Sequence, residues 1–176
     1  MNEVIKAIKE RRSVRKYKPD LLQDEVLDEI IDAGLYAASG KNHQAARIIV
    51  ITDKQLRDEL SDLNRRIGGW AQGFDPFYGA QTVLLVIAEK AWPTHVYDGS
   101  LVMGELMLAA SSLGVGSCWI HRAKEELETE EGKRLLERVG LAPDEWVGIG
   151  HCILGYPESE IPQAPPRGEN RVSYIR

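Results

Sequence analysis

The sequence has few of the residues on which disulfide-stabilised, metal-binding or nucleic-acid-binding proteins depend. It holds only two cysteines, Cys118 and Cys152, both in apolar, strand-like stretches. We therefore expect buried free thiols rather than a disulfide framework, and a reducing, cytoplasmic setting. The four histidines show no pairing at ligand spacing and no CxxC motif, which argues against a metal site. The formal net charge of −5 disfavours a binder of nucleic acid or membrane surfaces, which would carry a basic excess.

Long hydrophobic runs, internal repeats and low-complexity segments are also missing. The longest apolar stretches, such as residues 82–88, are far shorter than the about 20 residues of a membrane-spanning helix. No GxSxG motif is present, which argues against a hydrolase with a nucleophile elbow. Composition is ordinary for a globular protein, with 43% hydrophobic and 28% charged residues in a chain of 176. We expect a single domain over residues 1–176 that buries a sizeable core.

The hydrophobic pattern alternates between helical and extended periodicity. It predicts helices at residues 3–11, 24–38, 98–112 and 129–139, and one that follows the capping residue Asp53. It predicts strands at residues 47–52, 82–88, 117–120 and 146–154, and an irregular loop at 68–79. This alternation alone suggests a parallel α/β sheet, but periodicity does not determine strand direction.

The densest chemical signal is the run RRSVRK at residues 11–16, in an otherwise acidic protein. Arginine side chains bind phosphate oxygens through two parallel hydrogen bonds, and a serine hydroxyl supplies another donor. In an extended chain Ser13 and Arg15 point to one side, whereas Arg12 and Val14 point to the other. The alternative is a solvated charge run that compensates the end of the preceding helix. These residues by themselves leave both interpretations open.

Two further segments combine small and polar residues. The run AASGKNHQ at 37–44 lets backbone and amide groups approach a flat polar ligand, although a helix end followed by a turn also explains it. In GVGSCWIH at 114–121, the glycine pair follows a helix and precedes a strand. This order is the reverse of a dinucleotide-binding turn, so a Rossmann fold is rejected.

Taken in order, these segments resemble the FMN-dependent nitroreductase family. The matching pieces are residues 11–17, residues 37–44, the long helix that leads to residues 113–120, and the glycine-rich closing strand at 148–157. The resemblance spans nearly the whole chain. It implies an α+β fold with a mixed or antiparallel sheet flanked by helices, in place of the parallel sheet. It also implies an intertwined homodimer with both flavin sites at the dimer interface.

The resemblance assigns most of the FMN-binding role to basic residues. Arg11, Arg12 and Ser13 would engage the ribityl phosphate, and Arg15 would reach the pyrimidine side of the flavin. Arg167 matches a C-terminal basic position near the phosphate. None of these residues is expected to act as a catalytic acid or base, because the flavin N5 atom carries the chemistry.

The remaining site residues come from the other two segments. Ser39 and Asn42 match loop positions that line the flavin from the other protomer. Backbone groups near Ile120 and His121 match the stretch along the N5 edge. The loop at 68–79 shows no convincing match to flavin-contacting residues of the family. Its aromatic side chains either gate the pocket or anchor the loop; these are Trp70, Phe74, Phe77 and Tyr78.

The resemblance implies a two-stage reaction. NADH or NADPH passes a hydride to FMN and leaves, and a nitroaromatic, quinone or similar small-molecule acceptor then takes its place. One alternative is a specialised flavin enzyme of the same fold, such as a dehalogenase or an enzyme that consumes flavin. Another is a non-catalytic module that binds a phosphorylated ligand through the arginine cluster. A third is a dimer that keeps the fold without the cofactor.

Overall fold

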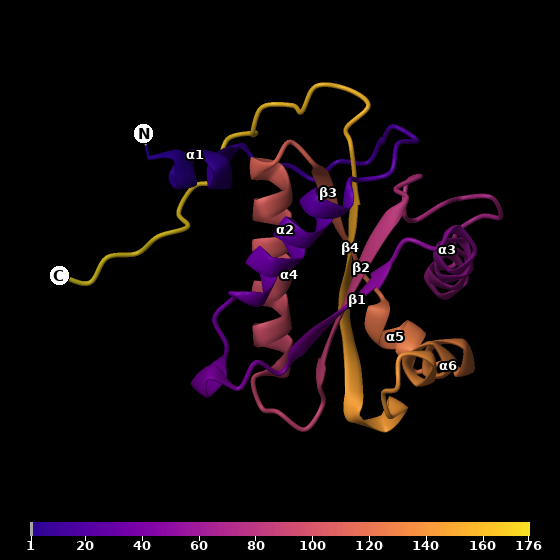
Figure 1. The fold of residues 1–176 in the computed structure, drawn as a ribbon. Coiled ribbons are helices and arrows are strands. Elements are labelled where there is room, and N and C mark those ends of the chain that lie inside the picture. Colours follow the sequence, from indigo (N-terminus) through magenta and orange to yellow (C-terminus); the bar gives the residue numbers. More distant parts are fainter. Residues whose placement is uncertain (1) are drawn as a thin grey trace.

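A computed structural model describes residues 2–176, in which an antiparallel sheet lies between two layers of helices (Figure 1). The strands are β1 (Ala46–Ile51), β2 (Thr82–Glu89), β3 (Gly116–Ile120) and β4 (Trp146–Gly155). Their order in the sheet is β1-β2-β4-β3, and every neighbouring pair is antiparallel. The expected α+β fold is confirmed, and the parallel sheet suggested by periodicity alone is wrong.

The strand β2 explains why periodicity could not give the strand direction. Its alternate side chains enter two different core clusters, one on each face of the sheet. Residues 83–88 are all 0% exposed, so the strand reads as a continuous apolar run. Such runs are typical of parallel sheets because helices cover both of their faces. Here helices cover both faces of an antiparallel sheet, and the same run results.

Five helices form the two layers (Figure 1). On one face of the sheet lie α2 (Asp24–Leu35) and α4 (His95–Ser112), and on the other lie α3 (Lys54–Gly68), α5 (Ala123–Leu127) and α6 (Glu130–Arg138). As expected, Asp53 caps α3, since its carboxylate accepts a hydrogen bond from Leu56 N at 2.8 Å. The sequence pattern did not predict α5. Two short 3-10 turns are also present, η1 (Gly40–Asn42) and η2 (Pro143–Glu145).

The central helix α4 starts earlier than its sequence suggests. The sequence pattern places its first residue at 98, but the helix begins at His95 and Asp98 is buried in its first turn. The carboxylate of Asp98 accepts hydrogen bonds from Gly40 N and Thr94 Oγ1, both at 3.0 Å. Asp98 therefore ties η1 to the start of α4. One side of α4 is open, with Tyr97 72% and Leu101 48% exposed.

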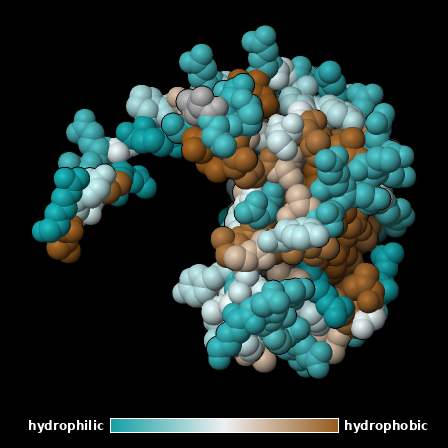
Figure 2. Space-filling model, turned by 60° about the vertical axis from the view of Figure 1, so that its left-hand side comes forward, coloured by the Kyte–Doolittle hydropathy of each residue, from teal (hydrophilic) through white to brown (hydrophobic). Residues whose placement is uncertain are grey.

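The two ends of the described chain lie apart from the sheet. The first helix α1 (Glu3–Glu10) has no buried residue, and its apolar side chains Val4, Ile5 and Ile8 are exposed. Every residue from 158 onward is exposed, and this C-terminal arm runs past α1 (Figure 1). Figure 2 shows hydrophobic side chains on the hollowed side between this arm and the body. None of the helices in residues 2–176 is long and apolar enough to cross a membrane.

Candidate functional site

The N-terminal segment 11–17 crosses the start of β3. Ser13 forms a parallel bridge with Ser117, and Val14 N donates a hydrogen bond to Ser117 O at 2.9 Å. The two chains approach so closely that a Cβ at Gly116 would lie 2.9 Å from Val14 Cβ. Real side chains do not approach that closely without displacement, so glycine at 116 permits this crossing. The bridge thus brings the RRSVRK segment against the GVGSCWIH segment.

Buried donors without partners lie on both sides of this crossing. Arg11 Nη1, Arg12 Nε and Ser117 Oγ are buried and have no hydrogen-bond partner within the described residues. Arg12 Nη1 donates to Arg11 O, so only part of the Arg12 guanidinium is satisfied. An unmet buried donor costs roughly 1–3 kcal/mol. An anionic group such as a phosphate could accept hydrogen bonds from all three of these unpartnered donors, two of which belong to cationic side chains.

An aromatic row connects this segment to the end of β3. The row consists of Trp70, Phe74 and Tyr78, with ring centroids 5.3 Å apart for the first pair and 6.0 Å for the second. The guanidinium carbon of Arg122 lies 4.5 Å from the Trp70 ring centroid, and that of Arg15 lies 5.9 Å from the Tyr78 centroid. The row therefore carries an arginine at each end.

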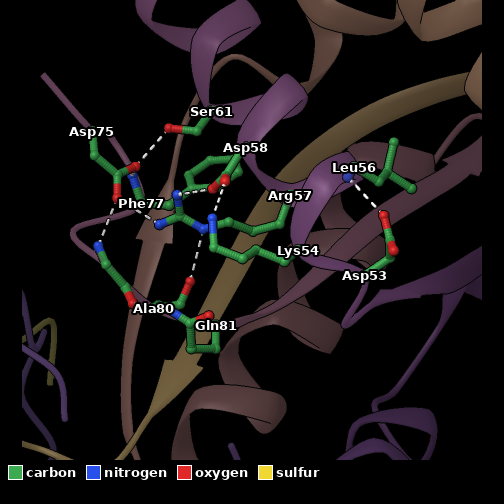
Figure 3. A network of polar contacts seen from close by, with 11 residues as sticks. Asp53, Lys54, Leu56, Arg57, Asp58, Ser61, Asp75, Phe77, Ala80 and Gln81 are labelled. Carbon is green, nitrogen blue, oxygen red and sulfur yellow. Dashed lines mark hydrogen bonds and ion pairs between the residues drawn. The ribbon is translucent and has the colours of Figure 1, made fainter. Parts of the chain in front are cut away.

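The loop that bears this row is fixed to α3 by a polar network (Figure 3). Arg57 Nε donates to Ala80 O at 2.8 Å, and its Nη2 donates to Asp75 at 2.5 Å. Asp75 also accepts from Ser61 Oγ at 2.5 Å and from Gly79 N at 2.7 Å. Burial alone would raise the pKa of Asp75, but hydrogen bonds from Arg57 and Ser61 and the Arg57 charge hold it below its usual value. Within the same loop Phe77 is fully buried and acts as the core anchor.

The end of β3 rests on a buried polar group that the sequence did not reveal. His121 O accepts a hydrogen bond from Asn64 Nδ2 at 2.8 Å, and Asn64 also donates to Glu126. Glu126 Oε2 lies 2.9 Å from His151 Nε2, with both side chains at most 1% exposed. Ile120 is buried and the His121 side chain is exposed. This arrangement fixes the backbone at 120–121, where the resemblance places the N5 edge of the flavin.

The loop residues Ser39 and Asn42 lie elsewhere in the chain. Ser39 Oγ accepts from Gln44 N at 3.0 Å, and Asn42 Oδ1 accepts from Gln44 Nε2 at 3.2 Å. Through Gly40 and Asp98 this turn is attached to the start of α4, whereas the Ser13 bridge lies beyond its end. A helix of 18 residues is about 27 Å long. The structure therefore does not bring Ser39 and Asn42 to Arg11–Ser13 within one chain.

Arg167 and the cysteines take no part in this cluster. Arg167 is exposed in the C-terminal arm, where its Nη2 donates to Pro165 O at 2.9 Å. Cys118 and Cys152 are both buried and free, as expected, and burial raises the pKa of Cys152. Over residues 2–176 there is no group of three or more His, Cys, Asp or Glu residues that could hold a metal ion.

The chain is thus an α+β protein with a cluster of unpartnered buried donors beside the edge strand β3. The sequence matches the Nitroreductase family over residues 8–156, so the chain belongs to the nitroreductase family. Among curated relatives, an FMN reductase [NAD(P)H] of Bacillus subtilis is 40% identical, with 99% of this chain and 74% of the relative covered. An NADPH-flavin oxidoreductase of Vibrio harveyi is 30% identical, with coverages of 95% and 70%. A solved nitroreductase with bound FMN from Desulfitobacterium hafniense superposes with a TM-score of 0.88 at 25% identity over all of both chains.

Proposed function

We propose that this chain is an NAD(P)H-dependent FMN oxidoreductase that reduces a nitroaromatic, a quinone or a similar small-molecule acceptor. The observation that carries the proposal is the set of buried, unmet donors on Arg11, Arg12 and Ser117. The family match and the flavin-dependent relatives support FMN as the ligand that meets them. Residues 1–176 would act as a single FMN-binding domain.

The residues at the crossing fit the phosphate of FMN. Two arginine side chains provide charge and N–H donors, and the hydroxyl groups of Ser13 and Ser117 add donors on the two bridged segments. The phosphate would satisfy buried groups that otherwise cost stability, so its binding energy would hold the cofactor. Arg167 would become a further phosphate ligand on folding of the C-terminal arm back against this crossing.

Bound FMN supplies hydride acceptance and release at N5, and the residues supply position and electrostatics. The backbone at Ile120 and His121, held by Asn64, would lie along the N5 edge. The positive charge of Arg15 would lie at the pyrimidine side and favour negative charge there. No side chain acts as a catalytic acid or base in this proposal. Binding of the nucleotide and then of the acceptor to the same face gives the two stages.

We propose that the functional unit is a homodimer. Ser39 and Asn42 lie at the opposite end of α4 from the arginines, so they can line the same flavin only from a second copy. The unburied apolar face of α1 and the open side of α4 provide surface for such a partner. A cytoplasmic location is part of the proposal and is supported by the two free cysteines.

The experiment that tests this function is visible spectroscopy of the purified protein after addition of FMN. We expect two flavin absorption bands in the desalted protein, and their bleaching when NADH or NADPH is added under nitrogen. Addition of a nitroaromatic or a quinone should then restore the two flavin bands. A protein that retains no FMN, or that retains FMN but is not bleached by either nucleotide, would refute the proposed reaction.

A further inference from the structure

We propose that Arg122 and the aromatic row form the binding wall for the acceptor and select planar aromatic acceptors that carry an acidic group. The inference rests on the proposed function, because that function places the flavin beside the wall. The aromatic row ends at Arg122 on one side and at Arg15 on the other. Arg122 directly follows the backbone assigned to the N5 edge, and Arg15 belongs to the flavin-binding segment. The row therefore spans two segments that border the same flavin.

The wall is a fixed structure rather than a mobile loop. Trp70 N donates to Arg65 O at 3.1 Å, and Trp70 O accepts from Arg65 Nη1 at 3.2 Å. The Trp70 ring lies on Gly68, where a Cβ would come within 2.7 Å of it. At the other end of the row, Asp75 and Arg57 pin the loop to α3 (Figure 3). Both ends of the row are thus held by the protein.

The row nevertheless remains accessible. Trp70 is 36% and Phe74 is 39% exposed, whereas the neighbouring Phe77 is 0% exposed and already anchors the loop in the core. Large aromatic side chains that are fixed but not buried provide a flat surface for another aromatic ring. Stacking of a planar acceptor on this surface would bury it next to the flavin edge.

The two flanking arginines give the wall its charge preference. Neither Arg15 nor Arg122 forms an ion pair with a carboxylate in the part of the chain that the structure describes, although the protein carries a net charge of −5. A guanidinium that stacks on Trp70 still directs its N–H donors outward in its own plane. Those donors match a carboxylate or phosphate on the acceptor.

Arg122 and Tyr78 also have unusual backbone conformations. Their φ angles are 81° and 52°, in the left-handed region that non-glycine residues seldom adopt. The surrounding contacts keep these residues in place despite that cost, and such positions concentrate at ligand-binding sites. The conformation turns the chain sharply after the N5-edge segment and places Arg122 over the row.

The test compares two acceptors that differ only in charge, 4-nitrobenzoate and its neutral analogue 4-nitrobenzamide. Each is titrated into the oxidised, FMN-loaded protein, and binding is followed by the change in the flavin spectrum without turnover. We expect 4-nitrobenzoate to bind about tenfold more tightly. Arg122→Gln should bring the two dissociation constants together by weakening 4-nitrobenzoate alone. Trp70→Leu should weaken both ligands, and the surface variant Arg138→Gln on α6 should change neither.

The outcomes separate this inference from the proposed function. Equal binding of the two compounds to the wild-type protein, with normal FMN loading and bleaching by NAD(P)H, overturns the charge preference and leaves the oxidoreductase intact. An Arg122→Gln variant that raises only the KM for NADPH assigns Arg122 to the nucleotide and also overturns the inference. Failure of the wild-type protein to retain FMN overturns both.

Discussion

Two kinds of buried or half-buried arginine occur in this chain, and they differ in how their donors are met. Arg57 is only 6% exposed, and its guanidinium donates to Ala80 O, Asp58 and Asp75. Arg11 and Arg12 each keep a buried N–H group without a partner in the described residues. Arg57 therefore has its hydrogen-bond partners within the fold and plays a structural role. In the proposed function, the other two would gain their partners from the phosphate of FMN.

Arg12→Ala should weaken FMN binding without weakening the apoprotein. Loss of a charge-assisted hydrogen bond to phosphate costs about 1.5–3 kcal/mol, which corresponds to roughly a 10- to 150-fold rise in the dissociation constant. The melting temperature of the apoprotein should stay level or rise, because a buried unmet donor is removed. Fluorescence titration of FMN and thermal unfolding measure the two effects. Arg66→Ala, which removes an exposed ion pair with Asp62, is the control; equal FMN affinity in both variants would contradict the assignment.

Gly116→Ala should disturb the crossing of the N-terminal segment over β3. The added Cβ would lie 2.9 Å from Val14 Cβ, so the segment must shift. Overpacking of this kind costs about 1–3 kcal/mol. We expect a lower melting temperature and weaker FMN binding. Adding Val14→Ala should partly restore both, because it removes the two Val14 Cγ atoms that would lie 3.0 Å from the new Cβ. Additive effects in the double variant, measured by urea unfolding, would show that the two sites do not interact.

At the scale of single elements, the loop 68–80 depends on one carboxylate. Asp75 accepts hydrogen bonds from Arg57, Ser61 and two backbone N–H groups of the loop. These contacts hold the pKa of Asp75 below its usual value. A carboxyl group with a depressed pKa in the folded state stabilises that state above its unfolded pKa, near 3.9, and loses this effect as the pH falls further.

Asp75→Asn should therefore destabilise the protein in a pH-dependent way. At pH 7 we expect a loss of about 1–3 kcal/mol in the free energy of unfolding, because charge-assisted hydrogen bonds are weakened. Below about pH 4 the carboxyl becomes protonated in the unfolded chain, while its lowered pKa keeps it ionised in the folded wild-type protein. The gap between the two proteins should therefore shrink as the pH falls towards that lowered pKa. Urea unfolding at pH 7, 5 and 3.5 measures this gap. A gap that stays constant over the whole range would mean that the ionised carboxylate contributes nothing.

The elements that sequence reasoning predicted best are those with a local signal. Asp53 with a helical apolar spacing located α3, and the crowded basic residues located the segment 11–17. The five-residue α5 lacks enough turns for a periodic pattern, so it was missed. Glu126 belongs to this helix, and Asn64 reaches it across 62 residues of sequence. No local pattern encodes such a contact, and an acidic residue on a helix is by default expected to face water.

At the scale of the whole molecule, two features bear on the proposed homodimer: an exposed apolar surface and the separation of the predicted site residues. Val4, Ile5 and Ile8 of α1 are 61%, 47% and 56% exposed, which is unusual for the apolar side of an amphipathic helix. The single-chain structure also leaves Ser39 and Asn42 far from the arginines. A second copy would resolve both features at once.

Ile5→Lys on α1 should produce monomers and lose FMN at the same time. A buried lysine at an interface costs more than the contact it replaces, and the monomer lacks the partner's Ser39 and Asn42. Light scattering coupled to size-exclusion chromatography gives the mass, and absorbance gives the flavin content. Val50→Lys, an equally exposed substitution on the edge strand β1, should leave both unchanged. A monomer with undiminished FMN affinity would contradict a shared site.

The bridge between Ser13 and Ser117 has a consequence for the order in which the protein folds during its synthesis. The arginine segment is synthesised about a hundred residues before β3, and Pro157, the partner of Tyr17, is made later still. Closing loops of this length costs entropy that only late contacts repay. The nascent chain therefore cannot complete this crossing until β3 and Pro157 have been synthesised. In the proposed function, FMN binding at the arginines would therefore follow the synthesis of these late segments.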